Sequence, residues 1–254
     1  MSGSALDVER SRSTSRRPLP PISIHAWLRW DRTVRMLPAA PARLLEIGCG
    51  LGSFGQLLAA RYEYTGLEPD PEAHEAAAER IGDLGRVLAL PVEELPPGSF
   101  DVVCAFEVLE HIEDDLTALR AWQEQLRPGG SLVLSVPAGR DRFGATDVKA
   151  GHFRRYDADD LRRVLVEAGY ANVTVRAYGF PIGYALEWGR NLYASRRAGP
   201  ESMAERTSAS GRWLQPPGWA AFGTWALAWP WRPAQRAFAG HGTGLVGRAT
   251  AGSS

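Results

Sequence analysis

The sequence lacks several features that would assign a protein to a class at once. It contains only two cysteines, Cys49 and Cys104, so we expect no disulfide framework and a cytoplasmic location. Basic and acidic residues each number 29, and the zero net charge favours neither nucleic acid nor a membrane surface as partner. No apolar run approaches the roughly 20 residues of a membrane span, and we see no apolar stretch typical of a secretory signal.

Hydrophobic residues make up 44% of the 254 residues, enough for a large core. Residues 1–21 are rich in Ser, Arg and Pro, and we expect them to form a disordered tail. Residues 22–180 are predicted to form the main α/β core, beginning with a helix. Residues 181–240 are predicted to be a tryptophan-rich insertion, and residues 241–254 the last strand and a tail.

Short apolar runs alternate with amphipathic segments along the predicted core. The predicted helices cover residues 24–37, 53–61, 70–82, 114–126 and 157–170, with Asp70 and Asp157 as N-caps. The predicted strands cover residues 43–47, 64–68, 86–90, 100–106, 131–137, 173–180 and 243–249. This alternation predicts a parallel, doubly wound sheet with helices on both faces, whose ligands bind beyond the carboxyl ends of the strands.

The stretch RLLEIGCGLGSFG is predicted to be a buried strand that runs into a glycine-rich turn. Gly50, Gly52 and Gly55 fit the dinucleotide fingerprint G-x-G-x-x-G. However, Glu46 at the end of the strand would face a pyrophosphate unfavourably, whereas it would suit a ligand with a positive amino group. The series Gly48, Gly50 and Gly52 would let the backbone approach a nucleoside that carries no phosphates.

Four motifs occur in order over residues 43–180: LLEIGCGLGSFG, YTGLEPDPEA, SFDVVCAFEVLEHIEDD and LRPGGSLVLSVP. With them the sequence resembles the class I S-adenosylmethionine-dependent methyltransferases of the type 11/12 kind. The resemblance implies a Rossmann-like, seven-stranded sheet that is mostly parallel with an antiparallel last strand. It also implies S-adenosylmethionine as the cofactor, and the tryptophan-rich helical insertion would then precede the last strand.

The resemblance further implies roles at the cofactor site. Glu46 would orient the turn or the methionine ammonium, and Glu68 would accept hydrogen bonds from both ribose hydroxyls. Pro91 stands where the family usually has an acid that meets the adenine amino group, so Val92 or Glu93 is expected to replace that acid. The residues expected to bind the cofactor are Glu46, Gly48, Cys49, Gly50, Gly52, Glu68, Pro69, Val92, Glu93 and Phe106.

Candidate catalytic residues follow the fourth predicted strand: Glu107, Glu110 and His111. Their spacing, E-x-x-E-H, resembles two metal-dependent subsets, the ubiquinone-pathway O-methyltransferases and the small-RNA 3′-end 2′-O-methyltransferases. His152 stands where the RNA enzymes have a further histidine. The four side chains could hold Mg²⁺, Mn²⁺ or Zn²⁺. The alternatives are that His111 acts as a general base without metal, or that these residues only stabilise the loops.

Arg154, Arg155 and Tyr156 are candidate substrate-binding residues together with His152, since they follow the fifth predicted strand. Two arginines could bind a carboxylate or phosphate. The alternative for the arginines is an ion pair with an acid of the next helix: Asp157, Asp159 or Asp160. The alternative for His152 is packing within its own loop.

The predicted insertion holds six of the nine tryptophans. Trp219, Phe222, Trp225 and Trp229 recur at spacings of three and four, which is typical of one helix face. Arginines flank this stripe, namely Arg206, Arg212, Arg232 and Arg236, and no acidic residue follows Glu205. Three interpretations stay open: a lid over the site, a homodimer interface, or peripheral contact of residues 213–236 with anionic lipid.

We therefore predict an S-adenosylmethionine-dependent methyltransferase that acts on a small-molecule or lipid-like acceptor, with oxygen as the favoured acceptor atom. The sequence carries no strong signal for nucleic acid as a partner. A metal-assisted RNA 2′-O-methyltransferase and an NAD-dependent oxidoreductase remain the alternative functions.

Overall fold

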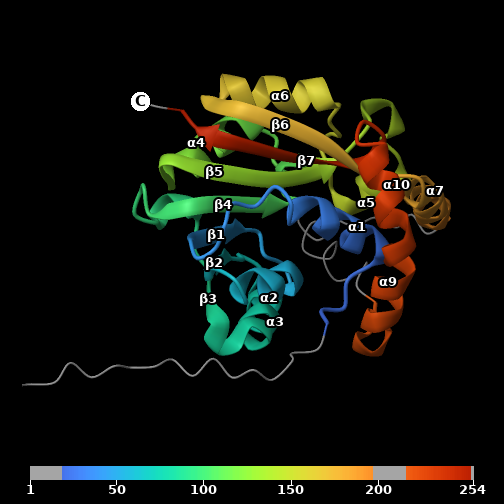
Figure 1. Cartoon of the computed structure of the whole chain (residues 1–254), viewed down its shortest axis with the longest axis horizontal. Helices are drawn as coiled ribbons and strands as arrows, with labels where there is room; N and C mark the ends of the chain where they lie inside the picture. The colour runs from blue at the N-terminus through green and yellow to red at the C-terminus, as the bar shows by residue number, and fades with distance from the viewer. Residues whose placement is uncertain (1–18, 197–215, 253–254) are drawn as a thin grey trace, which may run out of the picture.

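The computed structural model describes residues 19–196 and 216–252, so most of the predicted N-terminal tail lies outside the described residues (Figure 1). A single sheet runs through the middle of the molecule in the strand order β3-β2-β1-β4-β5-β7-β6. The strands are β1 Arg43–Ile47, β2 Glu63–Leu67, β3 Gly85–Leu88, β4 Phe100–Phe106, β5 Leu126–Pro137, β6 Tyr170–Gly179 and β7 Gly242–Ala251.

The direction of the strands confirms the predicted sheet. Strands β1 to β5 pair in parallel, whereas β7 runs antiparallel to both β5 and β6. Ile47, at the end of β1, lies in register with Leu67 on β2 and Ala105 on β4. The residues that follow these three strands therefore meet at one edge of the sheet, where the chain switches from one side of β1 to the other.

Helices cover both faces of the sheet. They are α1 Ile24–Thr33, α2 Ser53–Ala59, α3 Pro71–Ile81, α4 Asp115–Glu124, α5 Ala145–Ala150, α6 Ala158–Glu167, α7 Ile182–Ser195, α9 Ala221–Ala228 and α10 Arg232–Ala237. Helices α4 and α6 pack in the hydrophobic core on one face, and α1, α2 and α3 pack in the core on the other.

Alternation along the central strands divides the buried side chains between these two cores. Leu44 and Val102 point to the core of α1, α2 and α3, while their neighbours Leu45 and Val103 point to the core of α4 and α6. All four side chains have no exposed surface. A strand buried on both faces reads as a continuous apolar run, which is why the sequence showed these strands clearly.

Several predicted boundaries differ from the structure, and of the two predicted N-caps, both in place, only one makes a side-chain capping bond. Strand β5 begins at Leu126 instead of residue 131: Leu126 pairs with Phe100, and the pairing with β4 resumes at Ser131 opposite Val102, after an irregularity that contains the RPGG segment. Asp70 caps α3 by accepting a hydrogen bond from the Ala73 amide at 3.0 Å, as predicted. Asp157 makes no such bond to α6, and its carboxylate instead accepts from the Arg140 amide at 3.4 Å.

The insertion before β7 is present and helical, as predicted; within its described part α9 packs against α1, whereas α7 packs against α5 and the sheet (Figure 1). Thr224 on α9 donates a hydrogen bond to the Ile22 carbonyl at 2.8 Å. Gln235 on α10 has no exposed surface; it donates to the Leu28 carbonyl at 3.1 Å and accepts from the Gly179 amide at 3.1 Å. Trp213, Arg206 and Arg212 lie outside the described residues. Among the helices the structure describes, none has the length and hydropathy needed to cross a bilayer.

Candidate functional site

The turn after β1 has the backbone that its glycines predict. Gly48, Gly50 and Gly52 have φ angles of 64°, 54° and 72°, a region that favours glycine. A Cβ atom on Gly48 would lie 2.8 Å from a methyl group of Val108, and one on Gly52 would lie 2.9 Å from the Cα of Ala77. A Cβ on Gly50 would meet no heavy atom of the described chain within 4 Å. Gly50 is therefore the point where the turn faces open space.

Glu68, which follows β2, ties this turn to its own loop. One carboxylate oxygen accepts a hydrogen bond from the Gly50 amide at 2.7 Å, and the other accepts from the Asp70 amide at 3.0 Å. The residue is buried, with 8% of its surface exposed. Two backbone donors therefore hold the carboxylate beside the open face of Gly50.

Glu46 lies under the turn and bonds to a residue that the sequence analysis missed. The Tyr64 hydroxyl donates a hydrogen bond to the Glu46 carboxylate at 2.6 Å. Tyr64 fits there because Gly55 and Gly66 lack side chains; a Cβ on either would lie within 2.7 Å of the phenol oxygen. Burial raises the pKa of Glu46 to about 8, although the Tyr64 bond and Arg29 oppose the shift. In the sequence, only the two glycines that leave room for the tyrosine ring could have indicated the contact between Tyr64 and Glu46.

The remaining residues expected at the cofactor lie around the same edge. Phe106, at the end of β4, is buried and its ring contacts Phe54 with 5.1 Å between centroids. Cys49 is buried in the turn, and its amide donates to the Leu67 carbonyl at 3.0 Å. The adenine-side candidates differ in exposure: Val92 is buried in a short 3₁₀ helix, whereas Pro69 and Glu93 are exposed.

Glu107, directly after β4, is held by three side chains. Its carboxylate accepts hydrogen bonds from the hydroxyls of Ser135 at 2.9 Å and Tyr178 at 3.2 Å, and it pairs with Arg29 of α1 at 3.2 Å. Burial would raise the pKa of Glu107, but Arg29 and the hydrogen bond from Ser135 outweigh it and lower the pKa. The carboxylate is thus kept ionised. Arg29 and Tyr178 carried no sequence signal, because each reaches Glu107 from a distant part of the chain.

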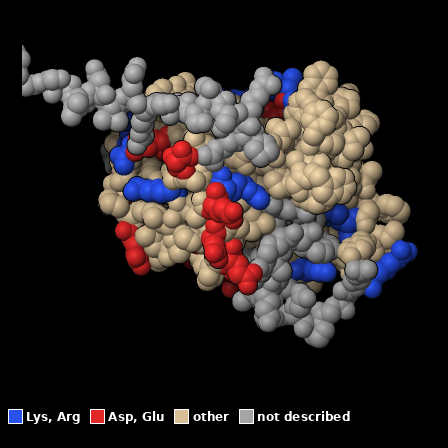
Figure 2. Space-filling model, turned by 90° about the horizontal axis from the view of Figure 1, so that it is seen from below, with Lys and Arg blue, Asp and Glu red and all other residues tan. Residues whose placement is uncertain are grey.

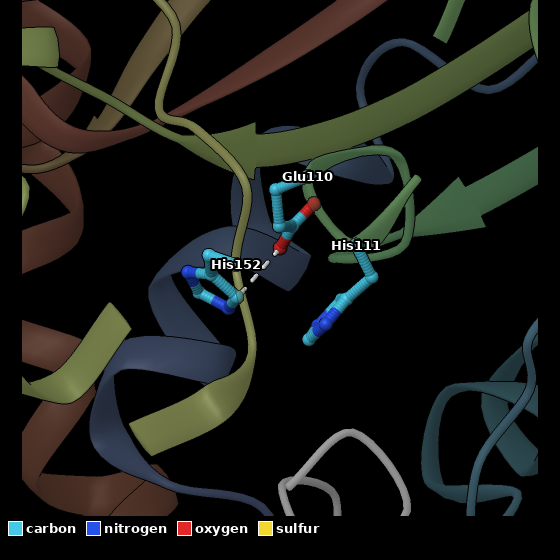
Figure 3. Close-up of side chains that lie close together, drawn as sticks. All are labelled: Glu110, His111 and His152. Atoms are coloured by element: carbon cyan, nitrogen blue, oxygen red, sulfur yellow. Dashed lines mark ion pairs between the residues drawn. The ribbon is translucent and has the colours of Figure 1, made fainter. Parts of the chain in front are cut away.

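Glu110, His111 and His152 come together as a separate cluster (Figure 3). Their ligand atoms lie within 4.8 Å of one another, and the two imidazole rings meet edge to face with centroids 4.6 Å apart. Glu110 and His111 belong to the short 3₁₀ helix after β4, while His152 reaches across from the loop after α5. Of the four residues predicted as metal ligands, Glu107 is not in this group.

The cluster holds buried polar atoms without partners. Glu110 has no exposed surface, and neither of its carboxylate oxygens finds a hydrogen bond within the described chain; the same holds for Nδ1 of His111. Burial and the charge of Glu107 raise the pKa of Glu110 well above its ordinary value. Burial and the nearby His152 lower the pKa of His111 to about 4. Unpaired groups of this kind are costly unless something binds them.

His152 is oriented by a carboxylate on α5. Its Nδ1 lies 2.8 Å from Asp147, and its Nε2 lies 4.0 Å from Glu110. Burial would raise the pKa of Asp147, but hydrogen bonds from His152 and Arg155 outweigh it and lower the pKa to about 2. Asp147 therefore fixes the ring so that Nε2 faces the cluster.

Arg154 and Arg155 both form ion pairs, but not with the acids named as the alternative to substrate binding. Arg155 makes a two-point ion pair with Asp147, with both N–O distances at 2.8 Å, and also pairs with Glu187 on α7. Arg154 pairs with Asp115 at 2.7 Å, and the Tyr156 hydroxyl donates to the same carboxylate at 2.8 Å. Both guanidinium groups are thus engaged by carboxylates, although not by those of Asp157, Asp159 or Asp160.

Comparison with known proteins identifies the fold and the family. The profile of the methyltransferase-domain family matches residues 25–175. A probable S-adenosylmethionine-dependent methyltransferase of Mycobacterium tuberculosis is 32% identical over 174 residues, which cover 64% of this chain and 62% of that protein. A ubiquinone biosynthesis O-methyltransferase of Xanthomonas campestris is 33% identical over 128 residues, which cover 47% of this chain and 53% of that protein. The chain thus spans less than two thirds of the length of these relatives.

Solved structures agree with this result at the level of the fold. An S-adenosylmethionine-dependent methyltransferase of Thermotoga maritima superposes with a TM-score of 0.56 and 21% identity, covering 89% of this chain and 91% of that one. The family profile spans more than half of the sequence and contains the glycine-rich turn, Glu68 and the cluster after β4. The chain therefore belongs to the class I S-adenosylmethionine-dependent methyltransferases.

Proposed function

We propose that the protein transfers the methyl group of S-adenosylmethionine to an oxygen atom of a small-molecule or lipid-like acceptor. The observation that carries this proposal is the cluster of Glu110, His111 and His152, which lies at the same edge of the sheet as the open face of Gly50. Such a cluster can hold a hydroxyl group and take up its proton. The printed name of the Xanthomonas relative, an O-methyltransferase, supports oxygen as the acceptor atom.

The cofactor would lie along the glycine-rich turn. Each oxygen of the Glu68 carboxylate accepts one backbone N–H and keeps further acceptor capacity, which suits the two ribose hydroxyls. Gly50 leaves room for the sugar and the methionine chain. Val92 and Pro69 are the candidates beside the adenine, together with Glu93. The methionine ammonium near Glu46 would favour the ionised form of that buried carboxylate.

The reaction itself asks little beyond alignment, because a sulfonium methyl group is already electrophilic. The acceptor oxygen must lie in line with the S–CH₃ bond at about 3–3.5 Å. The lowered pKa keeps the His111 imidazole uncharged at neutral pH, so it can accept a hydrogen bond from the acceptor hydroxyl, while the same shift makes it a weaker base than an ordinary histidine. Glu107 is a weaker candidate for that role, since Arg29, Ser135 and Tyr178 already occupy its carboxylate.

A divalent cation fits the same cluster. Glu110 offers two carboxylate oxygens that accept no hydrogen bond within the described chain, His111 offers an Nδ1 that makes none, and His152 offers Nε2. The bond of His152 Nδ1 to Asp147 is the arrangement that usually orients a metal-ligating histidine. We propose these three residues as the ligands. When bound, the ion would lower the pKa of the acceptor hydroxyl.

Calorimetry tests the cofactor part of this proposal. We expect the protein to bind S-adenosylhomocysteine but not NADH, and we expect Glu68→Ala to weaken that binding by at least about tenfold through loss of the charged acceptor. Glu63→Ala, on the exposed start of β2, is the matched control and should leave the affinity unchanged. Binding of NADH instead of S-adenosylhomocysteine would contradict the assignment.

A panel of acceptors tests the atom that is methylated. We would incubate the protein with S-adenosylmethionine and phenols, catechols, carboxylic acids or amines, and detect methylated products by mass spectrometry. Products on hydroxyl or carboxylate oxygen would support the proposal. Methylation of the amines alone would leave the methyltransferase assignment intact and reject oxygen as the acceptor atom.

A further inference from the structure

The described end of the insertion exposes large apolar side chains next to one another. Trp219 is 87% exposed, Phe222 68%, Leu227 60% and Trp229 58%. We call these four residues the aromatic surface; they lie on α9 and on the two short 3₁₀ helices that flank it, Gly218–Ala220 and Trp229–Trp231. Figure 2 shows a broad uncharged surface at the upper right, on the side where Figure 1 places α9.

Packing against α1 does not account for these side chains. Helix α9, with the sequence AFGTWALA, has Thr224 as its one polar residue, but only Ala221 and Ala228 are buried in it. Ala221 and Ala228 thus face the protein and Trp225 packs half-buried against the core, whereas Phe222 and Leu227 extend into the solvent. An exposed apolar patch of this kind marks an interaction site.

A positive charge excess adjoins the aromatic surface. The Phe222 ring contacts Trp225, and the guanidinium of Arg232 lies over Trp225 at 5.9 Å. Arg232, Arg35 and Arg236 all approach the single carboxylate of Asp31, at 4.0 Å for the first two and with a direct hydrogen bond for the third. Three guanidinium groups thus share one carboxylate, which leaves two positive charges uncompensated among these four groups.

We infer that the aromatic surface binds an anionic phospholipid membrane. Tryptophan favours the boundary between acyl chains and headgroups, and uncompensated arginines beside it attract anionic lipids. A homodimer fits less well, because a two-fold interface places the same patch of both copies face to face. The arginine excess of the two copies would then meet, and no acidic residue follows Glu205 to neutralise it.

This inference goes beyond the proposed function and does not depend on it. The patch is nevertheless connected to the site, since α9 packs on α1 and α1 carries the Arg29 that pairs with Glu107. A protein bound through α9 would hold its site close to the lipid surface, where acceptors with long apolar chains are found.

Vesicle flotation tests the inference. We expect the protein to float with vesicles of phosphatidylcholine and phosphatidylglycerol, to float much less with phosphatidylcholine alone, and to be released by 1 M NaCl as the charges are screened. The double variant Trp219→Ser/Trp229→Ser should bind anionic vesicles at least about tenfold more weakly, because two exposed indoles no longer enter the interface. Val166→Ser, at another 60% exposed apolar residue on α6, is the matched control and should float like the unaltered protein.

Two controls separate this result from other outcomes. Unchanged binding of S-adenosylhomocysteine would show that the double variant is folded. If neither the unaltered protein nor the variants bind S-adenosylhomocysteine, that result would count against the proposed function and not against this inference. No flotation of the unaltered protein with anionic vesicles would overturn the inference, as would equal flotation of the double variant. A dimer in light scattering that the double variant abolishes, without vesicle binding, would assign the surface to a second copy.

Discussion

The buried carboxyl group of Glu46 makes the stability of the protein depend on pH in an unusual direction. In the folded protein Glu46 is 2% exposed and has a pKa of about 8, compared with 4.5 for an ordinary glutamate. A carboxyl whose pKa is raised by folding contributes its full stability below about pH 4.5. That contribution is lost as the pH rises through about 8. Most paired carboxylates show the opposite dependence.

The size of the effect follows from the shift. A change from 4.5 to about 8 is about 3.5 units, and at 1.36 kcal/mol per unit the limit is about 5 kcal/mol. Glu46→Gln keeps the shape and the acceptor for the Tyr64 hydroxyl but cannot ionise. We therefore expect Glu46→Gln to match the unaltered protein near pH 5 and to become ~3–5 kcal/mol more stable by pH 9.

Urea unfolding at a series of pH values measures this difference directly. Other buried groups also titrate in this range, but they are common to both proteins and cancel when the two free energies of unfolding are subtracted. Glu63→Gln, at the 77% exposed side chain that begins β2, should keep the pH dependence of the unaltered protein. A constant difference between Glu46→Gln and the unaltered protein from pH 5 to pH 9 would refute the reasoning.

Three further predictions follow from the same site. Gly48→Ala should lower the free energy of unfolding by ~1–3 kcal/mol, because the new methyl group would lie 2.8 Å from Val108 and the φ angle of residue 48 is 64°. Gly50→Ala places its methyl group in open space, so it should lose less stability. It should nevertheless bind S-adenosylhomocysteine more weakly in calorimetry. Arg155→Gln should cost ~3–5 kcal/mol in thermal unfolding, since two buried carboxylates, Asp147 and Glu187, each lose one of their cationic or hydrogen-bonding partners, whereas Arg163→Gln at an exposed pair should leave the melting temperature unchanged. Chelation should slow methyl transfer and added Mg²⁺ or Mn²⁺ should restore it, without a change in S-adenosylhomocysteine affinity; an unaltered rate after chelation would reject the metal.

Short sequence motifs predicted the part of the site that is formed by the turns directly after the parallel strands. The glycines after β1 require positive φ angles, and Glu68 follows β2 by one residue, so strand order alone brings them together. The same reasoning brought Glu110, His111 and His152 to one edge of the sheet. The proximity of these residues needed only the direction of parallel strands and the loops that follow them, with the family resemblance for His152; their roles stay predictions.

Contacts between distant segments could not be predicted in this way. For Arg155 we weighed substrate binding against an ion pair with an acid close in sequence, but Tyr156 forms a bridge with Ala138 and Arg155 turns inward, toward Asp147 and Glu187. The acids of α6 pair instead with neighbours on that helix, such as Arg163. Helical spacing of three residues explains that preference. Which buried charge meets which depends on the packing of α5 and α7, and periodicity does not encode it.

Four carboxyl groups meet at the edge of the sheet, and their surroundings divide the chemistry between them. The Glu46 carboxyl is held neutral by burial, and the Glu68 carboxylate is fixed by two backbone amides. Glu107 is kept ionised by Arg29, so its charge is already balanced. Glu110 is the exception, because it is fully buried and neither oxygen has a hydrogen bond within the described chain. Burial also raises the pKa of Glu110 and favours its neutral form, but unlike Glu46 it has no hydrogen-bond donor among the residues that the structure describes, so of the four it is the group that we propose for a cation or an acceptor hydroxyl.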